Sequence, residues 1–103
     1  MGMDAYIYKI KKDPNNKSNI LEREELCYWR KFYDLNKMLQ YDDSMYAKDL
    51  RLTKEDVEKI LQFVAHNRDY FYGFSTVESV CEVLDKYDEL TNEGYTIVFN
   101  SDW

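Results

Sequence analysis

The chain has 103 residues, of which 20 are acidic, 14 are basic and 17% are aromatic, and its formal net charge is −6. This length predicts a single domain, residues 1–103, and 3 Gly and 1 Pro are too few for the turns of an all-β sandwich or barrel. Since no apolar run reaches about 18 residues and the first ten residues lack the pattern of a signal peptide, we expect a cytoplasmic protein that does not span a membrane.

Both ends of the chain are predicted to be strands. Residues 5–11 and 95–100 are rich in aromatic and β-branched side chains, which favour a pleated surface. Because a lone strand leaves its backbone groups unpaired, we expect the two terminal strands to pair with each other, either parallel or antiparallel. Residues 12–19 contain Pro14, three Asn and Ser18, and this composition is typical of a loop.

Two helices are predicted in the middle of the chain. Residues 22–40 have acids in the first turn and a stripe of apolar side chains at helical spacing. Residues 52–68 begin with Thr53 as a candidate N-cap and Asp56 three residues later, where a capping-box acid stands. Residues 41–50 show no period and are expected to be irregular, whereas residues 69–74 fit either a short strand or an aromatic loop.

The third predicted helix begins at a capping box, Ser75 and Glu78, and ends before Gly94. The resulting order, β-α-α-α-β, predicts a small α+β domain in which the terminal strands pair in a small sheet covered by three helices. Trp29 fits either the core of this domain, packed on the terminal strands, or a contact for a partner.

Three motifs of the chain occur in a characteristic order: residues 1–9 (MGMDAYIYK), 28–31 (YWRK) and 100–103 (NSDW). They resemble a family of small phage and prophage proteins that begin Met-Gly-Leu-Asp-Met-Tyr-Leu-Tyr-Lys, carry a Tyr-Trp-Arg-Lys-Ala-Asn helix and end in Ser-Ser-Trp after an acidic helix. This chain lacks the Ala-Asn and the later His and Trp of that pattern, and Asp102 replaces a serine. The resemblance therefore implies a setting, a mobile element in the cytoplasm of an infected cell, rather than a reaction.

Charge is unevenly distributed along the chain. Residues 1–40 hold eight basic and six acidic residues (+2), whereas residues 41–103 hold six basic and fourteen acidic ones (−8). An acidic chain lacks the positive field that holds phosphate backbones, so direct nucleic-acid binding is disfavoured. Four acids at spacings of 4, 3 and 4 share one face of the third helix: Glu78, Glu82, Asp85 and Glu89. With no base expected on that face, it is either a solubilising surface or a negative ridge that docks on a basic, nucleic-acid-handling protein.

Two further segments are candidate partner contacts. Arg30 follows Trp29, and these residue types dominate interface hot spots. Tyr70 and Tyr72 belong to a run of four aromatics in residues 70–74, which cannot all be buried if the segment is extended, since alternate side chains point in opposite directions.

Catalytic signals are weak in comparison. The chain contains no HExxH, CxxC, GxSxG or P-loop motif. A zinc site would require Cys27, Cys81 and the single His66 to converge, and we expect buried free thiols and a surface or cap histidine instead. Three acids of the irregular segment could serve a small metal-dependent hydrolase or nuclease: Asp42, Asp43 and Asp49.

The leading functional prediction is a non-enzymatic phage or mobile-element accessory protein that binds and inhibits a host protein. The expected partner is a nucleic-acid-handling defence effector, which would make the protein an anti-CRISPR-like inhibitor. No cofactor and no metal are expected. The alternatives are the small metal-dependent hydrolase or nuclease and a homo-oligomeric structural or accessory component of the phage.

Overall fold

The two ends of the chain pair with each other. β1 (Asp4–Asp13) and β5 (Thr96–Asp102) are antiparallel neighbours, with Asp4 opposite Asp102 and Ile10 opposite Thr96. The structure, a computed structural model, describes residues 3–30, 33–66, 72–73 and 75–103. It confirms an α+β domain with paired terminal strands, and it fixes their direction as antiparallel.

On its other side, β1 pairs with a long second strand, β2 (Asn16–Arg30). The loop predicted for residues 12–19 is therefore wrong, because the connection is a turn of only two residues, Pro14 and Asn15. The Asp13 carboxylate accepts a hydrogen bond from the Asn15 N–H at 2.9 Å, which stabilises this tight turn.

The helix predicted for residues 22–40 is also wrong over its first half, which belongs to β2. The helical spacing of apolar residues there coincides with a second pattern, in which Cys27 and Trp29, two residues apart, point to the same side and are buried. They lie opposite Ile7 and Ala5 of β1, so the two strands bury one face together. Within the described part of residues 22–40, the helical segment is α1 (Tyr33–Met38).

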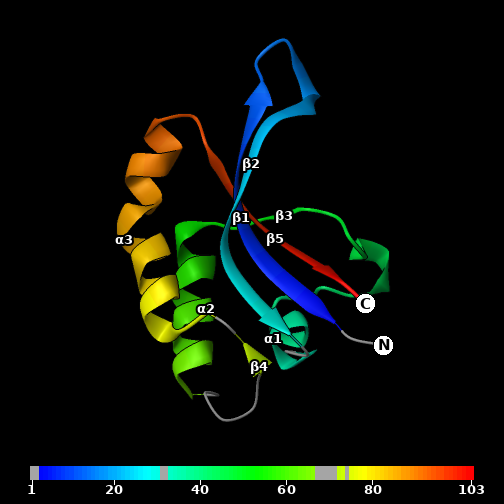
Figure 1. Cartoon of the computed structure of the whole chain (residues 1–103), viewed down its shortest axis with the longest axis vertical. Coiled ribbons are helices and arrows are strands. Elements are labelled where there is room, and N and C mark those ends of the chain that lie inside the picture. Colours follow the sequence, from blue (N-terminus) through cyan, green and yellow to red (C-terminus); the bar gives the residue numbers. More distant parts are fainter. Residues whose placement is uncertain (1–2, 31–32, 67–71, 74) are drawn as a thin grey trace.

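Two short strands complete the sheet. In the part of the chain that the structure describes, β3 (Leu50–Arg51) pairs with β5 and β4 (Tyr72–Gly73) pairs with β2, which gives the order β3-β5-β1-β2-β4 with all neighbours antiparallel (Figure 1). The strand alternative for residues 69–74 thus holds for residues 72–73, and the rest of that segment lies outside the described residues. Before β3, a single 3₁₀ turn, η1 (Asp43–Met45), interrupts the irregular segment.

Two longer helices, α2 (Lys54–His66) and α3 (Val77–Asn92), lie side by side against one face of the sheet (Figure 1). The predicted cap of α2 is confirmed, because the Asp56 N–H donates to Thr53 Oγ1 at 3.1 Å and the Thr53 N–H donates to Asp56 Oδ2 at 2.9 Å.

The cap of α3 differs from the predicted box of Ser75 and Glu78. Thr76 is the N-cap and Ser79 completes the box. Ser75 instead binds the backbone of β2, since its hydroxyl accepts from the Tyr28 N–H at 2.8 Å and its N–H donates to the Tyr28 carbonyl at 3.1 Å. At the other end Gly94 has φ +95°, as predicted for a left-handed cap.

The core lies between the sheet and the helices. Trp29 and Phe99 are its largest fully buried side chains, together with Ile7 of β1 and Ile60 of α2. The core prediction for Trp29 is therefore confirmed. Trp103 is partly buried and packs edge-on against Tyr41 and Tyr46. Among the described residues, no helix combines the length and the apolar character that crossing a bilayer requires.

Candidate protein-binding surface

The predicted acidic residues of α3 all lie on its exposed side. Glu78, Glu82, Asp85 and Glu89 are exposed, but the expectation that no base shares their face is wrong. Lys86 Nζ binds Glu82 Oε1 at 2.9 Å, and this contact lowers the pKa of Glu82 and raises that of Lys86. The helix still holds five acids and one base, so its exposed face remains negative.

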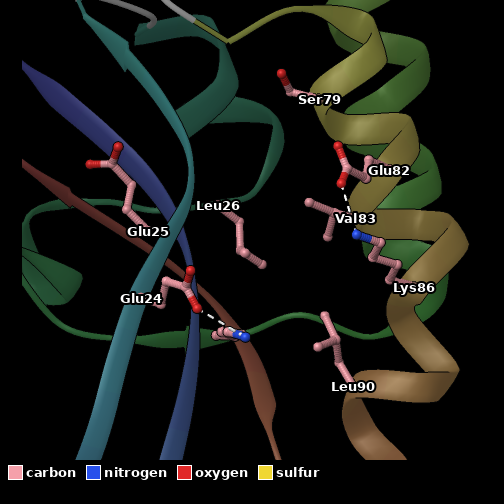
Figure 2. A pocket seen from close by; sticks show the side chains of 9 residues that line it. Glu24, Glu25, Leu26, Ser79, Glu82, Val83, Lys86 and Leu90 are labelled. Atoms are coloured by element: carbon pink, nitrogen blue, oxygen red, sulfur yellow. Dashed lines mark hydrogen bonds and ion pairs between the residues drawn. The ribbon is translucent and has the colours of Figure 1, made fainter.

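A groove of about 300 Å³ separates α3 from β2 (Figure 2). Its apolar surface comes from Leu26 of β2 and from Val83 and Leu90 of α3, and Figure 2 shows Leu26 extending from β2 toward Val83. Charged side chains line the remainder of the groove: Lys9, Glu24, Glu25, Glu82 and Lys86. Apolar surface framed by charges of both signs can bind a polypeptide segment that is itself both apolar and charged.

Lys9 organises the charges on the sheet side of this groove. Its ammonium lies 2.9 Å from Glu24 Oε2 and 4.5 Å from the centre of the Tyr95 ring. The hydrogen bond to Glu24 outweighs the cost of desolvation and raises the pKa of Lys9. The Tyr95 hydroxyl binds the Glu22 carboxylate at 3.0 Å, so the same cluster fixes two acids of β2.

Among the described residues, no strand lies beside the edge of β2 that borders the groove. β4 pairs only with Trp29 and Arg30, and Ser75 follows at Tyr28. From Asn16 to Cys27, no strand within the described ranges pairs with β2 on the side away from β1. Residues 21–25 are all exposed, so this edge is open to solvent.

Two other predicted contact residues lie together, apart from the groove. Arg30 of β2 is exposed and is the register partner of Tyr72 in β4. Its guanidinium Nε lies 3.9 Å from Asp4 Oδ1. Only the backbone of Tyr72 is described, and Tyr70 lies outside the described residues. The predicted contact residues therefore form two groups, one on α3 and one at the end of β2.

On the sheet face away from α2 and α3, three tyrosines form a stack that the sequence reasoning missed. The centre of the Tyr6 ring lies 5.2 Å from that of Tyr8 and 5.0 Å from that of Tyr28. The guanidinium carbon of Arg23 lies 4.8 Å from the centre of the Tyr8 ring. The Tyr28 hydroxyl donates to Asp4 at 2.6 Å, which raises the pKa of Tyr28 to about 12. Faces of these rings are therefore already used by one another and by Arg23, whereas a nucleobase stacks on a free face.

The acids considered for metal-dependent chemistry do not converge. Asp42 caps η1 by accepting the Ser44 N–H at 3.0 Å. Asp49 instead binds Arg23 at 2.7 Å and Asn100 at 2.9 Å. The described residues contain no group of three or more His, Cys, Asp or Glu side chains placed to hold a metal ion.

The three side chains that a zinc site would have required are found, as expected, in other roles. His66 Nδ1 lies 2.7 Å from the carbonyl of Gln62, in the last turn of α2, where an imidazole was expected to cap the helix. Cys27 and Cys81 are free thiols as expected, but burial was predicted correctly only for Cys27, since Cys81 is only partly buried.

Comparison of the chain with protein-family models, curated proteins and solved structures finds no match. The resemblance to small phage and prophage proteins therefore rests on the sequence motifs, and function has to be argued from the surface. Sequence reasoning missed the β-sheet side of the groove, Lys9 and residues 24–26. The turn residues Pro14 and Asn15, which closely follow the strand predicted for residues 5–11, were the available signal for this hairpin.

Proposed function

We propose that this protein is a non-enzymatic accessory protein of a phage or mobile element that binds and inhibits a host protein in the cytoplasm of an infected cell. The proposed partner is a basic, nucleic-acid-handling effector such as a CRISPR nuclease. A protein of this kind acts by occupying the surface that its partner needs for nucleic acid.

The observation that supports this proposal is the charge of the helical layer. α2 and α3 contain eight acidic and three basic residues, a net charge of −5, whereas the rest of the chain contains twelve and eleven, a net charge of −1. Both helices lie on the same side of the sheet (Figure 1). Nearly all of the excess negative charge is therefore presented on one side of the molecule.

The negative charge of α2 and α3 favours binding to a basic cleft of another protein. The four acids Glu78, Glu82, Asp85 and Glu89 follow one another at intervals of about 4.5–6 Å along the axis of α3, since each helical residue rises about 1.5 Å. A positive cleft that has evolved to bind phosphates attracts a row of carboxylates at long range, and the attraction speeds association at low salt. The partner's basic residues also exclude the nucleic acid that they would otherwise bind.

The test is binding to purified CRISPR effector nucleases and other nucleic-acid-handling host proteins at low and high salt. We expect the affinity to fall steeply with salt, and to fall about tenfold in the double variant Asp85→Asn/Glu89→Gln. The matched control, Asp34→Asn/Asp43→Asn, removes two exposed carboxylates outside the helical layer and should retain full affinity. An interaction that is absent, or indifferent to salt and to both variants, contradicts the proposal.

The mass of the protein in solution distinguishes this function from that of a homo-oligomeric phage component. The proposal expects a monomer that acquires mass only when the host protein is added. A stable oligomer that ignores the host proteins would favour the structural alternative.

A further inference from the structure

We propose that the groove between β2 and α3 binds an extended segment of the partner protein, which adds a strand to the open edge of β2. This inference rests on the proposed function in that the occupant belongs to the partner. It goes further in that it specifies the mode of binding and the chemistry of the bound segment.

The backbone of β2 supplies the first part of the argument. Between Asn16 and Cys27, the described residues provide no strand partner on the outer side of β2, so its outward N–H and C=O groups face solvent. An exposed strand edge of this kind is a template for another extended chain, and main-chain hydrogen bonds then provide much of the affinity. β4 and Ser75 already use the same edge at the far end of β2, which shows that it accepts partners there.

A β-bulge aims one side chain of this edge into the groove. Ile7 lies opposite Cys27, but the next residue, Tyr8, lies opposite Glu25, so Leu26 is an additional residue in β2. A bulge bends the strand and redirects the side chain at that position. Leu26 accordingly extends from β2 toward α3, with Val83 on the opposite side of the groove (Figure 2).

The side chains around the groove define the occupant. Leu26, Val83 and Leu90 provide an apolar surface for alternate apolar residues of an extended segment. Glu24 and Glu82 are each paired with a lysine of the groove, whereas no ion pair of Glu25 is found among the described residues. Three carboxylates against two ammonium groups leave the groove with a net charge of −1. The segment that fits is therefore one in which apolar residues alternate with Lys or Arg.

The same charges disfavour a second copy of this chain as the occupant. Residues 22–25 of β2 contain three acids and one base, and all four are exposed. Pairing two copies edge to edge would bring a charge of −2 from each strand together, and like charges on adjacent strands are destabilising. A basic segment of another protein meets no such repulsion.

The experiment uses the full chain and the capped hexapeptide Lys-Val-Lys-Ile-Lys-Val as the probe. We expect the peptide to bind, and amides within residues 20–27 to show chemical-shift changes and slower hydrogen exchange. N-methylation of alternate peptide amides, which removes backbone donors and leaves the charge intact, should weaken binding at least about tenfold. Replacing the three lysines of the peptide by glutamate should abolish binding.

Two variants of α3 distinguish binding in the groove from binding to the acidic surface of the helix. Glu82→Gln removes a carboxylate that lines the groove, and Asp85→Asn removes one from the same helix that does not. We expect the first to weaken peptide binding several-fold more than the second. A normal amide spectrum of each variant establishes that it is folded.

Three outcomes overturn the inference. If binding is indifferent to N-methylation and equally weakened by both variants, the peptide is held by the acidic surface alone, and the proposed function survives without strand addition. Absence of peptide binding, or amide changes confined to another site, also contradicts strand addition. Protection of β2 amides without peptide, together with a doubled mass, identifies a second copy as the occupant. If instead the peptide binds as expected but no host effector does, the groove stands and the proposed partner fails.

Discussion

The two halves of β2 differ sharply in burial. Its last residues place Cys27 and Trp29 in the core, whereas residues 21–25 are all exposed and Leu21 is 60% exposed. Each half contains a β-bulge, because Leu26 and Leu21 are both skipped in the pairing with β1. The bulged leucine near the core borders the groove and the other faces water. One strand thus serves the fold at one end and leaves its edge free at the other.

Thiol reactivity tests the burial of the inner half of β2, and here the largest effect is expected. Burial raises the pKa of Cys27 to about 12, so at pH 8 on the order of one thiol in ten thousand is ionised. Cys81 of α3 is only partly buried. We expect iodoacetamide to alkylate Cys81 first in the native protein, and Cys27 only after unfolding, as followed by peptide mass spectrometry. Equal rates at the two thiols would show that the inner half of β2 opens readily.

Removal of the buried indole tests the same half of β2 by its stability. Trp29→Ala should lower the free energy of unfolding by about 3–5 kcal/mol, since it leaves a large cavity in the core. That loss is a large share of the stability of a small domain. The neighbouring Arg30→Ala, at an exposed position, is the control in urea denaturation and should change little. A Trp29→Ala protein that unfolds like the parent would contradict the packing described here.

Within β2, burial of Trp29 was easier to predict from the sequence than the strand that contains it. Burial of Trp29 and pairing of the terminal strands follow from residue type and from the need to pair backbone groups, which hold in any tertiary context. The stretch 22–30 was predicted as helix because acids at its start and apolar residues at spacings of 3 and 4 favour a helix locally. Pairing with β1, a long-range interaction, overrides that preference.

The candidate surface was predicted only in part for the same reason. The acidic face of α3 depends on spacing within one helix, so its exposed residues could be placed from the sequence. The groove requires β2 and α3 to lie next to each other, which is a tertiary contact. The ion pair of Glu82 with Lys86 could have been predicted from the sequence, because the two residues are four positions apart on one helix. The open edge of β2 depends on which strands are missing beside it, which no local pattern encodes.

Substitution of Asp49 tests how much its contacts between the outer half of β2 and β5 stabilise the fold. Its carboxylate binds Arg23 of β2 and Asn100 of β5. Burial alone would raise the pKa of Asp49, but these two hydrogen bonds outweigh it and hold the pKa below its ordinary value of 3.8. Asp49→Asn should lower the free energy of unfolding at pH 7 by about 1 kcal/mol, because a charge-assisted contact is lost at a partly exposed site.

The pH dependence of that loss follows from the direction of the shift. A carboxylate with a lower pKa in the folded state contributes stability that is complete above the unfolded value and disappears as the pH falls through the folded value. The difference between parent and Asp49→Asn should therefore be largest at neutral pH and shrink below about pH 4, as measured by urea denaturation at several pH values. A difference that is constant down to pH 2 would mean that the carboxylate charge plays no part.

The smallest effect is expected at the solvent-facing bulge. Leu21→Ser should change the free energy of unfolding by no more than about 0.5 kcal/mol, since the side chain is 60% exposed. Leu26→Ser, the same substitution at the bulge beside the groove, is the matched variant and should cost more because that side chain packs against the core cluster. Urea denaturation of both decides the point. If Leu21→Ser is as costly as Leu26→Ser, the outer half of β2 is part of the cooperative core, and its edge is less free to take another strand.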